Sequence, residues 1–165
     1  ERLKPGKGMK GWDKVYFAIT TPFYFITLIL AGFDASRFHW SPELPFYIYV
    51  AAILIFCAGH GIFIWARRTN SYFSSVVRIQ KERGHKVCQD GPYKYVRHPG
   101  YVGGILFTAV MPLILGSLWA FIPTAITLVF MFVRTALEDK TLKEELEGYR
   151  EFMKKTRYRI IPYIW

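Results

Sequence analysis

Cysteine is scarce in this 165-residue sequence, and its two cysteines are poorly placed to pair with each other. Cys57 lies in an apolar run and Cys88 in a basic loop, so we expect no disulfide and a reducing environment for the loops. His85 precedes Cys88 by three residues, but no second pair of ligands accompanies them, so the sequence predicts no metal site. No segment has the pattern of a signal peptide. The chain begins with Glu1 rather than Met, which leaves room for further N-terminal residues or another span.

Acidic residues are also few, with 12 against 22 lysines and arginines and a formal net charge of +10. The basic residues lie in blocks between apolar runs rather than along one soluble face, so we expect no nucleic-acid partner. Hydrophobic residues make up 52% of the chain, more than the core of a soluble protein of this length usually needs. A lipid bilayer as the partner accounts for both observations. The sequence therefore predicts a single integral membrane domain over residues 1–165, and it leaves the oligomeric state open.

Charge is absent from several runs that are long enough to cross a membrane. Residues 15–32 form an uncharged run of 18 residues, about one crossing of a roughly 30 Å hydrocarbon layer, with Pro22 predicting a kink. Residues 45–66 form a second run, which is closed by two arginines. Each of these two runs predicts one transmembrane helix.

A third uncharged run, residues 102–133, is too long for one crossing. Its 32 residues would reach about 48 Å as a single helix, which overshoots the bilayer. Gly116 and Ser117 near its middle favour a tight turn, so we expect a helical hairpin over residues 99–134. The fold class predicted is all-α, with about four transmembrane helices.

The distribution of basic residues favours four spans over three. Lysine and arginine number 5 before the first run, 1 in the loop after it (Arg37), 8 between residues 67 and 97, and 8 from residue 134 onward. With four spans, 21 of the 22 lie on one side of the membrane, as the positive-inside rule requires. The sequence thus predicts a multi-pass protein whose polar loops and active site face the cytoplasm.

Residues 135–155 predict an amphipathic helix after the hairpin. Apolar side chains recur in it at spacings of 4, 3 and 4, namely Leu142, Leu146, Tyr149 and Met153. Four residues before this stripe stands Glu138, a carboxylate that is expected to lie on the buried face. Its partner is expected to be Arg134, or else the ammonium or ribose hydroxyls of a bound cofactor, with Asp139 as a second acceptor.

The connection between the second span and the hairpin, residues 84–101, is polar and contains two strong turn signals. It ends in the sequence Arg97-His98-Pro-Gly-Tyr101. The two glycines that follow, Gly103 and Gly104, would let a ligand or another backbone approach closely. Folding of the hairpin is expected to bring this loop against the acidic pair at residues 138 and 139.

These residues resemble the membrane methyltransferase family that includes isoprenylcysteine carboxyl methyltransferases and, more distantly, phospholipid N-methyltransferases. The resemblance covers roughly the C-terminal half, in three pieces: residues 84–101, the apolar hairpin, and residues 134–162. An RHPxY motif, followed one hairpin later by an acidic pair and a Tyr-containing helix that ends in Arg-x-x-Pro, is specific in combination. Glu138-Asp139 stands where a pair of glutamates is common in that family.

The resemblance implies a methyltransferase that uses S-adenosylmethionine and acts on a lipidic or prenylated acceptor, either a small molecule or a peptide. The cofactor-binding part would be residues 84–165, and the residues implied to enclose the cofactor are His98, Tyr101, Gly103, Gly104, Glu138 and Asp139. Arg157 or Arg159 could orient a carboxylate acceptor by paired hydrogen bonds. An amine or thiol acceptor would first need deprotonation, for which His98 or Tyr101 is available.

Two other functions remain open. The RHPGY loop and the C-terminal YRIIPYI also resemble the ends of sterol reductases, which use NADPH, although the short chain and the EDKTLKEELEGY stretch favour methyl transfer. The second alternative is a non-enzymatic membrane scaffold. In that case Arg97-His98 would contact lipid phosphates, and Glu138-Asp139 would be favourable negative charge in the first turn of a helix.

Overall fold

The computed structural model describes residues 8–165, and within them all regular secondary structure is helical. Four long helices form the body of the fold: α1 (Gly11–Phe33), α2 (Phe46–Thr69), α3 (Pro99–Ile114) and α4 (Phe121–Glu145). The π-helical segment η1 (Asp34–Phe38) extends α1, and the short helix α5 (Tyr149–Lys155) follows α4. Two 3-10 turns, η2 (Lys81–Arg83) and η3 (Gly91–Lys94), lie in the connection between α2 and α3. The predicted all-α class is confirmed.

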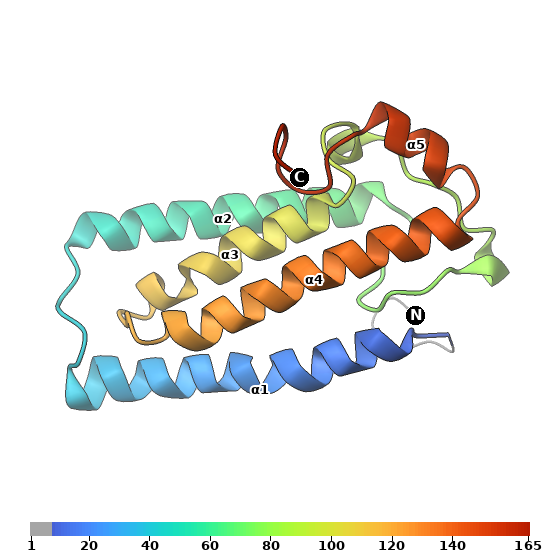
Figure 1. The fold of residues 1–165 in the computed structure, drawn as a ribbon. Coiled ribbons are helices and arrows are strands. Elements are labelled where there is room, and N and C mark those ends of the chain that lie inside the picture. Colours follow the sequence, from blue (N-terminus) through green and yellow to red (C-terminus); the bar gives the residue numbers. More distant parts are fainter. Residues whose placement is uncertain (1–7) are drawn as a thin grey trace.

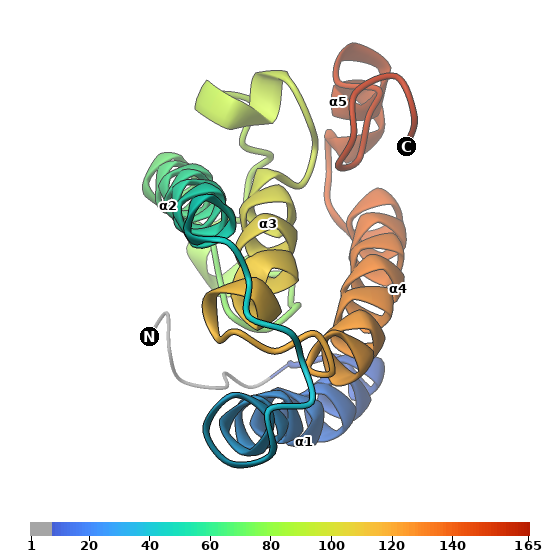
Figure 2. The ribbon, with the colours of Figure 1, turned by 90° about the vertical axis from the view of Figure 1, so that its left-hand side faces the viewer.

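The four long helices run lengthwise, and each is antiparallel to the one before it in sequence (Figure 1). Seen from the end, α3 lies between α2 and α4, and α1 packs beside α4 (Figure 2). This order places the start of α1, the α2–α3 connection and α5 at one end of the bundle (Figure 1). The segments that carry the predicted polar motifs therefore gather there.

Three helices are long and apolar enough to cross a membrane: Gly11–Phe38, α2 and α4. The fourth, α3, is equally apolar but has 16 residues, which span about 24 Å at the usual rise of a helix. Large apolar side chains such as Phe25 and Phe46 are exposed on the outer surface, whereas small and hydroxyl-bearing residues such as Ala52 and Thr124 are buried inside. This arrangement is typical of helices packed in lipid. The prediction of an integral, multi-pass membrane protein is confirmed.

The basic residues lie as the four-span topology requires. Those between residues 67 and 97 and those from residue 134 onward share one end of the bundle with the start of α1, and Arg37 follows α1 at the opposite end (Figure 1). Of the five basic residues that precede the first span, Arg2, Lys4 and Lys7 lie outside the described residues.

The hairpin is confirmed, and most of residues 135–155 are helical as predicted, but they do not form one separate helix. Gly116 has φ 69° at the turn between α3 and α4, a left-handed conformation that glycine adopts without strain. Residues 135–145 do not begin a new helix; they continue α4 for three more turns. The chain then breaks at Leu146, which is extended, and at Gly148, with φ 79°, before α5 begins.

The apolar stripe that predicted this helix is nonetheless buried on both sides of the break. Leu146, Tyr149 and Phe152 form a cluster with Ala66 of α2 and Tyr93 of η3, and Leu142 and Met153 pack against it. The break at Gly148 lets α5 fold back over the α2–α3 connection (Figure 1). The apolar stripe thus predicts correctly which side chains are buried, but not that the helix is interrupted between Glu145 and Tyr149.

At the end of the bundle opposite the polar motifs, Asp34 links the α1–α2 connection to the α3–α4 turn. Its side chain is fully buried and accepts hydrogen bonds from the backbone N–H of Ser41, at 2.8 Å, and from the hydroxyls of Ser41 and Ser117. Ser41 belongs to the α1–α2 connection and Ser117 to the α3–α4 turn. This carboxylate therefore fixes the two connections to each other.

Helices α2 and α3 pack backbone to backbone at two glycines, Gly59 and Gly103. A Cβ atom added to Gly103 would lie 2.4 Å from the carbonyl oxygen of Gly59 and 2.7 Å from the backbone nitrogen of Phe63. These are backbone atoms, so the two helices would have to move apart. Gly103 is therefore a packing residue of the α2–α3 interface.

We expect Gly103→Ala to lower the free energy of unfolding by about 1–3 kcal/mol, because overpacking a tight backbone contact forces the helices to shift. Thermal unfolding in detergent measures this loss. Gly104→Ala is the matched control, because its added Cβ would meet only the flexible end of Met131, at 2.9 Å. An equal loss of stability in both variants would contradict the assignment.

Candidate active site

A cavity of about 350 Å³ opens at the polar end of the bundle, between α1, α3, α4 and the α2–α3 connection. This volume falls in the range of about 300–1,000 Å³ that is typical of small-molecule sites. Its polar wall includes Arg97, His98, Tyr101, Glu138 and Tyr149. Its apolar wall includes Phe17, Phe63, Gly104, Phe107 and Met131. The cavity thus joins a polar chamber to the apolar interior of the bundle.

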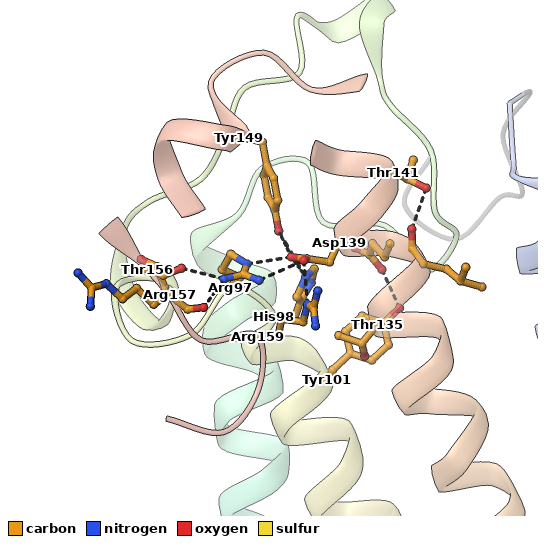
Figure 3. Close-up of polar contacts among 12 residues, drawn as sticks. Arg97, His98, Tyr101, Thr135, Asp139, Thr141, Tyr149, Thr156, Arg157 and Arg159 are labelled. Carbon is orange, nitrogen blue, oxygen red and sulfur yellow. Dashed lines mark hydrogen bonds and ion pairs between the residues drawn. The ribbon is translucent and has the colours of Figure 1, made fainter. Parts of the chain in front are cut away.

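A single carboxylate, that of Asp139, organises the polar chamber (Figure 3). Arg97 donates to both of its oxygens, from Nε to Oδ1 at 2.8 Å and from Nη2 to Oδ2 at 3.0 Å. Tyr149 donates from its hydroxyl to Oδ1 at 2.8 Å, and Arg159 donates from Nε to Oδ2 at 2.9 Å. His98 Nε2 lies 3.1 Å from Oδ1. Asp139 is only 2% exposed, so these partners satisfy a charge that water does not reach.

Arg97 also fixes the C-terminal segment to the loop. Its Nη1 donates to the backbone carbonyls of Thr156, at 3.1 Å, and Arg157, at 2.5 Å. The backbone N–H groups of Arg97 and His98 donate to the carbonyls of Tyr158 and Arg159, both at 2.9 Å. Burial alone would lower the pKa of Arg97, but the hydrogen bonds to Asp139 and its charge raise the pKa above the usual value. Arg97 and the backbone of His98 therefore bind the C-terminal segment, residues 156–159, to the loop that precedes α3.

His98 and Tyr149 lie beside each other at the cavity wall. The Tyr149 hydroxyl is 3.4 Å from His98 Nε2, and both side chains are buried. Burial raises the pKa of Tyr149 strongly, and the adjacent Asp139 carboxylate raises it further, so Tyr149 remains a neutral donor. Because an ionised carboxylate can only accept, His98 donates to Asp139 through Nε2.

Glu138, next to Asp139 in sequence, has a different environment. It lines the cavity, is half-buried, and accepts one hydrogen bond, from the Tyr101 hydroxyl at 2.7 Å. Within residues 8–165 it forms no salt bridge. The predicted partner, Arg134, instead pairs with Asp13 of α1. Of the two partners expected for Glu138, the salt bridge with Arg134 is therefore wrong, and Tyr101 occupies only one of about four acceptor positions on its carboxylate.

The structure brings the two predicted motifs together, but the predicted residues fall into two groups. His98, Tyr101, Gly104 and Glu138 line the cavity. Gly103, Asp139, Arg157 and Arg159 are not among its lining residues. Gly103 packs on α2 and Asp139 lies inside the network, while the Arg157 side chain is exposed and points away from Asp139 (Figure 3).

Sequence reasoning missed three residues of the site. The apolar stripe includes Tyr149, although the Tyr149 hydroxyl donates to Asp139. The motif at residues 97–101 predicts no partner for Arg97, although its guanidinium donates to both carboxylate oxygens of Asp139. Asp13 pairs with Arg134 of the cavity wall, although the sequence shows only an acidic residue at the start of a span. The signal that was available is that an acid next to an apolar run is costly unless a cation meets it.

Comparison with known proteins gives the family. Residues 49–144 match the sequence model of the isoprenylcysteine carboxyl methyltransferase family, which is more than half of the chain. A protein-S-isoprenylcysteine O-methyltransferase of Schizosaccharomyces pombe is 26% identical over 131 residues, which cover 73% of this chain and 49% of that protein. The chain therefore spans about half the length of the curated relative that it matches. On the family match, this chain belongs to the isoprenylcysteine carboxyl methyltransferase family.

Proposed function

We propose that this chain is a membrane methyltransferase that binds S-adenosylmethionine in the cavity beside Glu138 and transfers its methyl group to a lipidic or prenylated acceptor. The observation that carries the proposal is the Glu138 carboxylate, which faces the cavity with one bound donor and no salt bridge among the described residues. Membership of the family supports the reaction class.

The residues present suit such a cofactor. A carboxylate has about four acceptor positions, and Tyr101 uses one of those on Glu138, so ribose hydroxyls or an ammonium group find a partner there. When bound, S-adenosylmethionine supplies a methyl group made electrophilic by its sulfonium. Tyr101, Gly104 and His98 form the adjoining wall. We therefore propose His98, Tyr101, Gly104 and Glu138 as the cofactor contacts. Asp139 would hold His98 in place by a hydrogen bond, and Gly103 would allow the close packing of α3 on α2.

The chain's main contribution to catalysis is to hold the reacting groups in position. The network around Asp139 fixes His98 and Tyr149, while the Tyr101 hydroxyl fixes Glu138. A carboxylate acceptor needs no proton removed. An amine or thiol acceptor would need a base, and His98 at the cavity wall is the candidate for that role.

The apolar wall of the cavity indicates how the acceptor is bound. Phe17, Phe63, Phe107 and Met131 come from α1, α2, α3 and α4, so a lipid chain lying among the helices would meet apolar surface. Neither Arg157 nor Arg159 lines the cavity, and the Arg159 Nε is bonded to Asp139, so we propose no acceptor contact for them. Because 21 of the 22 basic residues belong to the same side of the four-span topology, we propose that the cavity faces the cytoplasm.

Ligand-induced stabilisation of the purified protein in detergent tests the cofactor. We expect S-adenosylhomocysteine to raise the melting temperature and NADPH to leave it unchanged. A ligand present at 100 times its Kd stabilises the bound state by about 2.7 kcal/mol. A shift with NADPH alone would favour the reductase alternative, and no shift with either ligand would favour the scaffold.

Transfer of a labelled methyl group in proteoliposomes tests the acceptor. A farnesylated cysteine with a free carboxylate, the same compound blocked as its methyl ester, and phosphatidylethanolamine distinguish a carboxylate acceptor from an amine. We expect label in the free carboxylate compound and none in its ester. Label in phosphatidylethanolamine alone would replace the carboxylate by an amine as the acceptor.

A further inference from the structure

Asp13 lies in the first turn of α1 and is fully buried. The function proposed above assigns no part in the reaction to this residue. Arg134 of α4 donates to it from Nε to Oδ1, at 2.7 Å, and from Nη2 to Oδ2, at 3.3 Å. The backbone N–H of Val77 donates to Oδ2 at 2.7 Å. One carboxylate therefore joins α1, α4 and the α2–α3 connection.

The part of that connection held by Asp13 is residues 73–77, here termed the strap, and all five of its residues line the cavity. Arg134 Nη2 donates to the carbonyl of Ser75 at 2.7 Å. The backbone N–H of Lys10 donates to the carbonyl of Val77 at 3.3 Å. The strap is thus attached to α1 and α4 through Asp13, Arg134 and the backbone of Lys10.

The same ion pair is linked to the proposed cofactor contacts. The Arg134 guanidinium lies over the rings of Tyr16, at 4.5 Å, Phe17, at 4.9 Å, and Tyr101, at 5.7 Å. Tyr16 and Phe17 line the cavity, and Tyr101 donates to Glu138. A shift of Arg134 would therefore be transmitted to the ring that positions Glu138.

Helix α1 lies outside the residues that match the family, which begin at residue 49. We propose that α1 is nevertheless part of the ligand site, and that Asp13 is a positioning residue: through Arg134 and Val77 it holds the strap and the Tyr101 ring against the cavity. This inference rests on the proposed function for the identity of the ligand. The competing explanation is that Asp13 only neutralises Arg134 and anchors α1.

Hydrogen–deuterium exchange and ligand binding separate the two explanations. In Asp13→Asn we expect amide exchange in the strap to rise by roughly tenfold, because Val77 loses a charged acceptor. We expect the Kd for S-adenosylhomocysteine to rise by about tenfold as well, since loss of a charge-assisted hydrogen bond has effects of that order. In the unaltered protein, S-adenosylhomocysteine should slow exchange in the same peptide.

Asp34→Asn is the matched control. Asp34 is also a fully buried acid that continues from α1, but it lies at the opposite end of the bundle. This variant should lower the melting temperature while strap exchange and ligand affinity stay unchanged. If Asp13→Asn behaves in the same way, Asp13 is merely structural and the inference is overturned.

A double variant covers the case in which Asp13→Asn does not fold. Asp13→Asn with Arg134→Gln leaves no buried charge without its partner, so the fold is expected to persist. Strap exchange alone is then measured, because Arg134 itself lines the cavity. Exchange at the level of the unaltered protein would overturn the inference. Faster strap exchange in the single variant Asp13→Asn, together with no binding of S-adenosylhomocysteine by the unaltered protein, would sustain the role of Asp13 and reject the proposed cofactor.

Discussion

Replacement of Asp139 by alanine is expected to destabilise the folded protein by about 3–5 kcal/mol, because it leaves a buried arginine without its counter-charge. Arg97 is 6% exposed and directs its Nε and Nη2 at Asp139. The hydroxyl of Tyr149 loses its acceptor at the same time. Chemical or thermal unfolding in detergent measures the loss. Because Arg97 also clasps the C-terminal segment, we expect limited proteolysis to become faster at residues 156–159.

The double variant Asp139→Ala with Arg97→Met controls for the unpaired charge. Removing both charges of a buried pair is far less costly than removing one, so this variant should regain part of the lost stability. The carbonyls of Thr156 and Arg157 still lose a donor, so recovery should be incomplete. If Asp139→Ala alone is as stable as the unaltered protein, the network does not support the fold.

The arrangement of the spans could be predicted from the sequence because the membrane imposes simple rules. Uncharged length identified the helices, Gly116 indicated a turn in the longest run, and the 21-to-1 distribution of basic residues favoured the four spans that this turn creates. The structure has that turn, with Gly116 in a left-handed conformation. The interruption of the C-terminal helix at Gly148 could not be predicted in the same way. The spacing of apolar residues indicates which side chains are buried, and this spacing continues on both sides of a short break.

The site was predictable as a meeting of motifs but not as a set of contacts. Glu138 and Asp139 are adjacent in sequence, and successive residues of a helix point about 100° apart, so they face different surroundings. Periodicity could assign a buried face to Glu138, but it could not reveal that Asp139 lies among two arginines, a histidine and a tyrosine. The pairing of Asp13 with Arg134, 121 positions apart, depends on how α1 packs on α4.

The second large effect is expected for Glu138→Gln, which should weaken binding of S-adenosylhomocysteine by about 10- to 150-fold. The range corresponds to the loss of about 1.5–3 kcal/mol when a hydrogen bond to a charged group is removed. Glutamine keeps the shape of the side chain and can still accept from the Tyr101 hydroxyl, so the melting temperature without ligand should change little. Titration calorimetry on the purified protein measures the affinity directly.

Two further variants make this expectation specific to the position of Glu138. Glu144→Gln removes the same charge from an exposed site on the same helix, α4, and should leave the affinity unchanged, which excludes a general effect of net charge. Tyr101→Phe removes the donor that fixes Glu138 but keeps the carboxylate, so it should weaken binding less than Glu138→Gln does. Together with Asp139→Ala, these variants assign separate roles to two adjacent acids, one that contacts the ligand and one that holds the wall behind it. Unchanged affinity in Glu138→Gln would remove the observation on which the proposed cofactor site depends.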